Sequence, residues 1–152
     1  SRDGNNVALP GLNHNLDDLS IAIGLSSLSR LNLTITKRRI MVDTLRNKLD
    51  SNVIIPNGIH NSSPFIIPLT FNSKEIKTVV SSHLYDNYVP HNPEYRFNVS
   101  SWSWMTKYTN GNCSTPNTQE YLNRSLFIYI NENYRKCHMN YISNIINKSL
   151  MI

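Results

Sequence analysis

The sequence begins to specify a fold at Gly11-Leu12-Asn13-His14-Asn15-Leu16-Asp17-Asp18-Leu19-Ser20-Ile21-Ala22-Ile23-Gly24-Leu25, where an irregular turn leads directly into a helix. Asp17 or Asn15 is well placed to cap that helix, because both residue types accept hydrogen bonds from the free backbone amides of a first turn. Gly24 would allow close approach to a neighbour. We expect an amphipathic helix over residues 17–29, with apolar residues recurring near helical spacing at Leu16, Leu19, Ala22, Ile23 and Leu28.

The size and composition of the chain are those of one globular domain. It has 152 residues, 39% of them hydrophobic, and a mean hydropathy of -0.36. Its longest apolar runs, such as residues 53–55 and 127–130, are far shorter than the roughly 20 residues that span a bilayer. We therefore expect one domain over residues 1–152 and no membrane partner. No signal peptide is visible, so we expect the protein to lie in the cytoplasm. Because the chain begins without methionine, we also expect a fragment or a processed product.

Charge and cysteine content argue against two kinds of site. The net charge is +5 and the sequence pI is near 9.3, but the excess reflects scarce acidic residues. The one short basic run, Lys37-Arg38-Arg39, falls on the predicted exposed side of a helix, so we expect no nucleic-acid partner. Cys113 and Cys137 have no histidine or further cysteine at ligand spacing, so we expect no metal site and two reduced thiols.

The remaining pattern predicts an α+β fold in which helices pack on a small sheet. Pro68 should place its strand at an edge of the sheet or at a bulge, because proline has no N–H to donate to a neighbour. Asn72 and Ser73 are positioned to cap the helix that follows. A loop over residues 92–117 carries many aromatic residues, which is typical of functional or interfacial segments. The expected helices lie at about 31–50, 74–85, 118–123 and 136–150, and the expected strands at 65–71 and 125–130.

Two of these helices have apolar residues at helical spacing, which we expect to face the core. The set in the first helix is Ile35, Val42, Leu45 and Leu49, and the set in the second is Ile76, Val79, Val80 and Leu84.

Four short motifs follow one another along the chain. Residues 11–24 are similar to the pattern Gly-x-Asn-x-Arg-Met-x-Glu-Leu-x-Ala-Ala-x-Gly, and residues 25–32 to Leu-x-Gln-Leu-x-Lys-Leu-Asp. Residues 117–126 are similar to a small helix followed by a strand, and residues 131–148 to a closing Glu-Asn-Tyr and Ile-x-x-Ala-Ile-x-Lys helix. In this order the motifs resemble the small C-terminal domain of the DegT family of sugar aminotransferases, which are vitamin-B6-dependent enzymes of fold type I. The resemblance covers residues 11–150.

The resemblance implies pyridoxal 5'-phosphate chemistry, in which an amino group moves from glutamate or glutamine to a keto-sugar. In the family, the lysine that binds the cofactor lies in the large N-terminal domain. We therefore expect no catalytic residue in this chain, and a lysine-bearing large domain or partner chain, in a homo- or heterodimer, that shares the cofactor. The seven lysines all fall on predicted helix surfaces or loops: Lys37, Lys48, Lys74, Lys77, Lys107, Lys136 and Lys148.

Asn13 matches the asparagine that, in the family, reaches the cofactor phosphate of the neighbouring subunit. A side-chain amide can donate to a phosphate oxygen without adding charge. From the residues alone, Asn13 could equally cap the helix or make a local turn. Asn15 stands where the family has arginine, so an anion contact by that arginine would be lost.

The family's substrate-facing loop corresponds to residues 91–104. His91, Tyr95 and Trp102 could stack on a sugar or hydrogen-bond to it, because aromatic faces pack well on apolar C–H surfaces. The same loop could instead pack on the large domain or on a dimer mate. A rival reading of the whole chain is a non-catalytic remnant domain that acts as a protein-interaction module, and the arginine-to-Asn15 difference favours it slightly.

Overall fold

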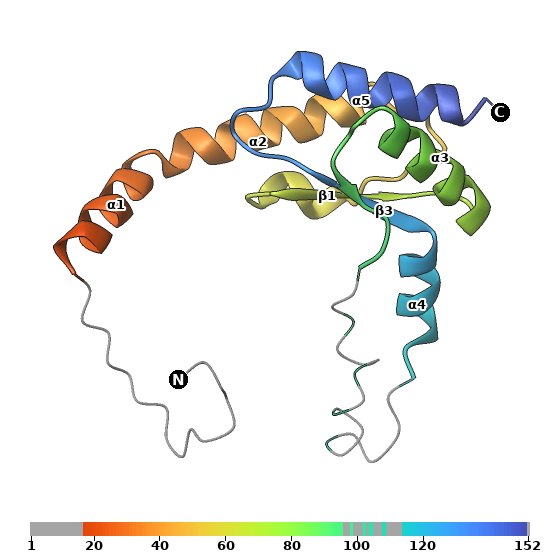
Figure 1. Ribbon diagram of the computed structural model, residues 1–152, viewed down its shortest axis with the longest axis horizontal. Helices are drawn as coiled ribbons and strands as arrows, with labels where there is room; N and C mark the ends of the chain where they lie inside the picture. The colour runs from red at the N-terminus through yellow and green to blue at the C-terminus, as the bar shows by residue number, and fades with distance from the viewer. Residues whose placement is uncertain are drawn as a thin grey trace. The chain divides into compact units, whose positions relative to one another are not determined.

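A computed structural model describes residues 17–95, 98, 102, 104, 108 and 114–151 (Figure 1). Contacts divide the chain into two compact units, Ser1–Asn32 and Leu33–Ile152. The expectation of one domain over residues 1–152 stays a prediction.

The first unit contains α1 (Asp18–Ser29). Asp17 is its N-cap, as predicted, and its carboxylate accepts the Ser20 backbone N–H at 2.7 Å. The expected apolar face is not covered, since no residue of α1 is buried by the described part of the chain. A Cβ added at Gly24 would meet nothing within 4 Å, so the expected close approach is not found there. The apolar residues of α1 are spread around the helix, so its sequence does not specify one face that the rest of the chain should cover.

The second unit is built on a three-stranded antiparallel sheet in the order β1-β3-β2. Its strands are β1 (Ile66–Thr70), β2 (His91–Asn92) and β3 (Ser125–Tyr129). The register pairs Ile66 with Tyr129 and Thr70 with Ser125. The predicted strands at 65–71 and 125–130 are confirmed to within a residue at each end.

Pro68 lies in an edge strand, as predicted. Thr70 exchanges two backbone hydrogen bonds of 2.9 Å with Ile54, on the side of β1 that faces away from β3. Pro68 is two residues from Thr70, so its nitrogen points to that same outer side. The missing proline N–H therefore costs the β1–β3 ladder no hydrogen bond.

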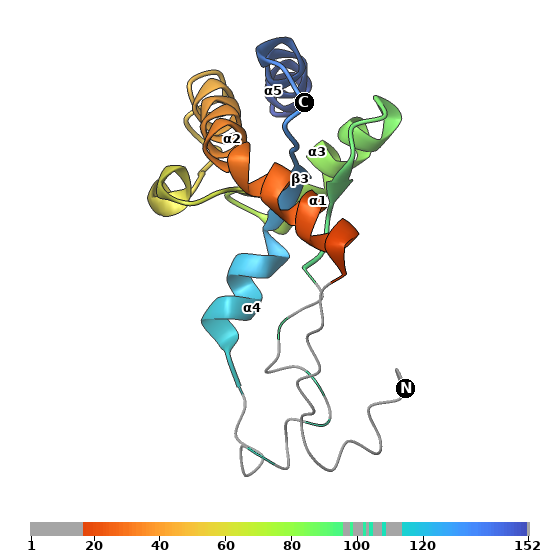
Figure 2. The same ribbon diagram turned by 90° about the vertical axis from the view of Figure 1, so that its left-hand side faces the viewer.

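Three helices cover one face of the sheet and a fourth lies on the other side (Figure 2). The covering helices are α2 (Leu31–Arg46), α3 (Lys74–Asp86) and α5 (Lys136–Ser149), and the fourth is α4 (Pro116–Asn123). A short 3-10 helix, η1 (Asn57–Asn61), precedes β1. The core lies between the sheet and the three helices, and its completely buried side chains include Val42, Leu45, Ile67, Leu69, Val80, Leu84, Leu126, Ile128 and Ile146. The predicted α+β arrangement, with helices packed on a small sheet, is confirmed.

Most predicted helix boundaries agree with the structure, but two boundaries and one predicted core residue differ. The helix expected to reach residue 50 ends at Arg46, and the helix expected from residue 118 begins at Pro116, since proline is well suited to a first helical position. Val79, expected to face the core, is 41% exposed, whereas its neighbour Lys77 is buried. The inward stripe of α3 follows Lys77, Val80 and Leu84, whose spacings of three and four residues define one helix face.

Among the described residues, no helix combines the length and the apolar character needed to cross a bilayer.

Candidate functional site

A small cavity lies where α3, α4 and the segment after β2 meet. Its volume is about 230 Å³, which is below the 300–1,000 Å³ that is usual for a small-molecule site. Its walls are mostly polar, and they bring together side chains that are far apart in sequence: Lys74, Lys77, Glu94, Tyr95, Asn98, Gln119, Leu122 and Asn123. Such a set offers hydrogen-bond donors and acceptors to a polyhydroxylated ligand.

Lys77 is the residue of this cavity that the sequence interpretation missed. We expected all lysines on helix surfaces or loops, and for Lys77 this is wrong, because its side chain is only 8% exposed. Its ammonium group donates a hydrogen bond of 3.2 Å to the backbone carbonyl of Pro93. A buried ammonium needs such a partner to offset the loss of water. The three- and four-residue spacing of Lys77, Val80 and Leu84 was the signal that could have found it.

Tyr95 is the one predicted substrate-binding residue that lines this cavity. Its ring lies 5.4 Å from the ring of Phe127, in a tilted arrangement that joins the segment after β2 to the central strand β3. Aromatic pairs of this kind help to fix ring orientation. Tyr95 is still 42% exposed, so part of its surface is available for a ligand or a further protein surface.

His91 lies in β2 and lines a different cavity, of about 560 Å³, that extends along the C-terminal half of α3. Its Nδ1 is 2.9 Å from the Val89 carbonyl oxygen and its Nε2 is 2.8 Å from the Ser81 hydroxyl. Because a carbonyl can only accept, Nδ1 donates, and in the neutral ring Nε2 accepts from Ser81. Both ring nitrogens are thus engaged within the chain, which leaves only the ring face for a ligand.

Trp102 lines neither cavity. Its ring lies 5.6 Å from Trp104, and Trp104 lies 6.1 Å from Tyr108 in an edge-to-face arrangement, so that these three residues form an aromatic cluster. Within the described residues, Tyr95, His91 and Trp102 are therefore not brought into one cavity. Their roles in substrate binding stay predictions, and Asn13 lies outside the described residues.

The basic run 37–39 is partly engaged in tertiary contacts instead of forming a free charged face. Arg38 makes an ion pair of 3.2 Å with Glu132, and Arg39 Nε donates to the Ser62 carbonyl at 3.2 Å. Hydrogen bonds from the Glu132 backbone amide and from Arg38 lower the pKa of the Glu132 carboxyl. The ion pair joins α2 to the turn before α5.

Metal-ligand chemistry finds little support in the described part of the chain. No group of three or more His, Cys, Asp or Glu side chains there could hold a metal ion. Cys137 is a free, exposed thiol, and Cys113 lies outside the described residues.

Comparison with solved structures finds the same fold in larger aminotransferases. Spr1654 of Streptococcus pneumoniae, assigned as a sugar aminotransferase, matches in its apo-form with a TM-score of 0.70 and 13% identity, over 90% of this chain and 37% of that protein. It matches in PMP- and PLP-forms as well. PseC of Helicobacter pylori, an aminotransferase involved in the biosynthesis of pseudoaminic acid, matches with a TM-score of 0.74 and 14% identity, over 90% and 38% of the two chains. The aminotransferase TlmJ of Streptoalloteichus hindustanus matches with a TM-score of 0.68 and 15% identity, over 88% and 36%.

The chain thus spans little more than a third of the length of these proteins. At such low identities the likeness establishes the fold. A comparison with curated proteins finds no match. The family model, by contrast, covers almost the whole sequence, from residue 2 to residue 147. On that extent of match, the chain belongs to the DegT/DnrJ/EryC1/StrS aminotransferase family.

Proposed function

We propose that this chain forms the C-terminal portion of a pyridoxal-phosphate-dependent aminotransferase. The reaction would transfer an amino group from glutamate or glutamine to a keto-sugar, in free or nucleotide-linked form. The observation that carries the proposal is the family match over residues 2–147, joined to a fold that corresponds to about a third of each solved sugar-aminotransferase chain.

The described residues do not make up a complete cofactor site. Pyridoxal phosphate, when bound, supplies an electron sink and carries the amino group between the two substrates. It needs a lysine enclosed with it, and Lys77, the buried one among the described lysines, already donates to the Pro93 carbonyl. We therefore assign the cofactor-binding lysine to the large domain or to a partner chain. Asn13 would contribute an amide to the cofactor phosphate.

The cavity beside Tyr95 would form one wall of the sugar site. Its polar lining suits hydroxyl groups, and the partly exposed Tyr95 ring suits the apolar face of a sugar. Its volume of about 230 Å³ is too small for a nucleotide-linked sugar, so the remaining walls would come from the large domain. In this arrangement Lys77 would hold the wall in place through Pro93.

The exposed apolar side chains of α1 support assembly with further protein surface. Leu19, Leu25 and Leu28 are each more than 60% exposed, and large exposed apolar side chains gathered on one helix are typical of interaction sites. We propose that a large domain and a two-fold mate cover such surface in a cytoplasmic dimer.

Native mass spectrometry of the protein purified from its own source, combined with a visible absorbance scan, tests the proposal. We expect a lysine-bearing polypeptide, linked to this chain or bound to it, together with the yellow absorbance of protein-bound pyridoxal phosphate. The same sample should release 2-oxoglutarate from glutamate when a keto-sugar is supplied. A colourless chain that runs alone would overturn the proposal and favour the non-catalytic interaction module.

A further inference from the structure

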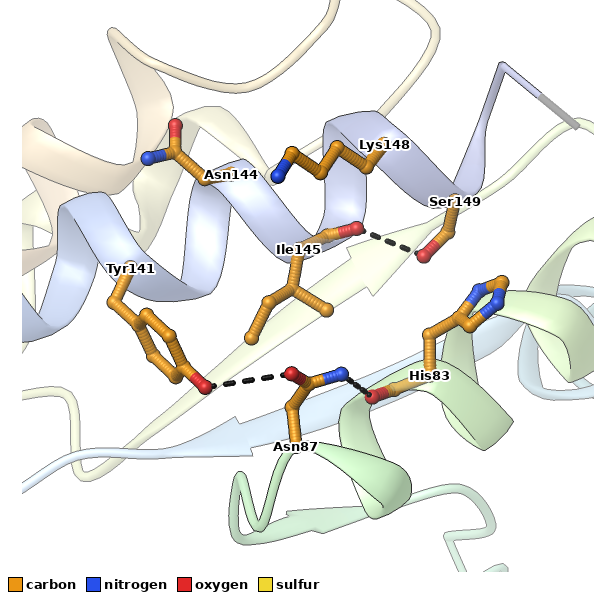
Figure 3. A pocket seen from close by; sticks show the side chains of 7 residues that line it. All are labelled: His83, Asn87, Tyr141, Asn144, Ile145, Lys148 and Ser149. Carbon is orange, nitrogen blue, oxygen red and sulfur yellow. Dashed lines mark hydrogen bonds between the residues drawn. The ribbon is translucent and has the colours of Figure 1, made fainter.

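A groove between α3 and α5 lies apart from the cavity of Tyr95 and shares no lining residue with it (Figure 3). Its volume is about 400 Å³, which is within the range of small-molecule sites. Ile145, only 8% exposed, forms its apolar floor between the two helices.

One end of the groove is closed by a hydrogen-bonded bridge between the helices. The Tyr141 hydroxyl donates to Asn87 Oδ1 at 3.4 Å, and Asn87 Nδ2 donates to the His83 carbonyl at 2.8 Å. Figure 3 shows the Tyr141 ring turned toward Asn87 beside the Ile145 floor. A flat aromatic surface is thus held next to an apolar floor, which favours a ligand with a flat apolar body.

The rim of the groove is cationic and has no acidic counterpart. Lys148 and Asn144 lie on the α5 side, and no aspartate or glutamate is among the lining residues. Within the described part of the chain, the Lys148 ammonium makes no ion pair or hydrogen bond with another residue. An ammonium beside an apolar floor attracts an anion, and an amide such as that of Asn144 can donate to the same anion.

His83 adds an unsatisfied polar group at the other end. Its Nδ1 is buried and has no hydrogen-bond partner in the described structure. A buried nitrogen without a hydrogen-bond partner costs free energy, and a ligand could recover this free energy after the imidazole ring turns.

A single lysine with neutral donors around it suits one negative charge better than the two charges of a phosphate, which usually attract several cations.

We infer that the groove between α3 and α5 binds a small aromatic carboxylate, with its ring packed against Tyr141 and Ile145 and its carboxylate near Lys148. This site is independent of the proposed aminotransferase chemistry.

Equilibrium dialysis of radiolabelled benzoate against the full chain, in the assembly in which it purifies, tests the inference. We expect saturable binding of one benzoate per chain, at least fivefold weaker competition by neutral benzamide, and no competition by pyridoxal phosphate. Binding that is not saturable, equal competition by benzamide, or displacement by pyridoxal phosphate would overturn the inference.

Two matched substitutions locate the site on α5. Lys148→Gln should weaken benzoate binding about fivefold, in keeping with one partly exposed charge pair. Lys136→Gln removes the same charge from the same helix outside the groove and should leave binding unchanged. Both side chains are exposed, so both variants should fold, and circular dichroism would verify this. Equal effects of the two substitutions would show a general charge effect and would overturn the site.

Discussion

Helices α1 and α5 have similar lengths, 12 and 14 residues, but use their apolar residues in different ways. In α5 the apolar positions form one stripe, six of its residues are buried, and α3 is the element that it packs against most. In α1 apolar residues surround the helix and none is buried by the described residues. Burial of apolar surface contributes about 25 cal/mol per Å², so α5 gains stability from its own chain. The described residues leave the apolar side chains of α1 exposed.

The largest test of this difference compares the same substitution in both helices. Ile146 in α5 is fully buried, and Ile23 in α1 is 59% exposed. Ile146→Ala should lower the free energy of unfolding by about 2–5 kcal/mol, because it leaves a cavity in the core. Ile23→Ala should change it by no more than about 0.5 kcal/mol. Urea unfolding followed by circular dichroism measures both values, and similar losses would mean that α1 is packed in solution.

The N-caps of α1 and α3 give a second, smaller contrast. The Ser73 hydroxyl accepts the Ile76 backbone N–H at 3.4 Å at the start of α3, a helix that packs on the core. Ser73→Ala should lower the free energy of unfolding by about 1 kcal/mol. Asp17→Ala should instead leave the urea midpoint unchanged and reduce helicity in α1 alone, as read from backbone carbon chemical shifts. A shifted urea midpoint for the Asp17 variant would show that the stability of the core depends on α1.

The C-terminus of α3 offers a substitution that should raise stability. Tyr88 has a φ of 56° and is 94% exposed. Its N–H and that of Val89 donate to the carbonyls of Tyr85 and Leu84, a helix-ending arrangement that glycine favours. Tyr88→Gly should raise the free energy of unfolding by about 0.5–1 kcal/mol, since it relieves the left-handed conformation without loss of packing. An unchanged or lower urea midpoint would contradict a strained α3 end.

Low pH should reduce the helicity of α1, and this is the smallest of the expected effects. Hydrogen bonds from the Ser20 backbone and hydroxyl lower the pKa of the Asp17 carboxyl below its ordinary value of 3.8. A lowered folded-state pKa adds stability that is present above the unfolded-state pKa and lost as the pH falls through the folded-state value. Helicity in α1 should therefore decline below about pH 4, as measured by carbon chemical shifts. Asp17→Asn caps without titrating, so its α1 should keep its helicity; an equal decline in this variant would assign the loss to other groups.

Local chemistry in the sequence determined most of the secondary structure. Asp17, one of two predicted caps, and Ser73 indicated helix starts because their side chains accept amide hydrogen bonds. Pro68 indicated an edge strand or a bulge because it has no N–H, and the structure has an edge strand. The ordered motifs also indicated the family. These signals act over a few residues, so they can be recognised in the sequence without the tertiary contacts.

Tertiary structure alone decided which faces are buried and which residues meet. The burial of Lys77 depends on Pro93, sixteen residues away, and the exposure of Val79 depends on the direction of the core. His91, in β2, and Tyr95, in the segment after it, are four residues apart in sequence but line different cavities. Helical periodicity predicts a stripe of residues, but the neighbours that cover it come from distant parts of the chain, and among the described residues α1 has none that bury it.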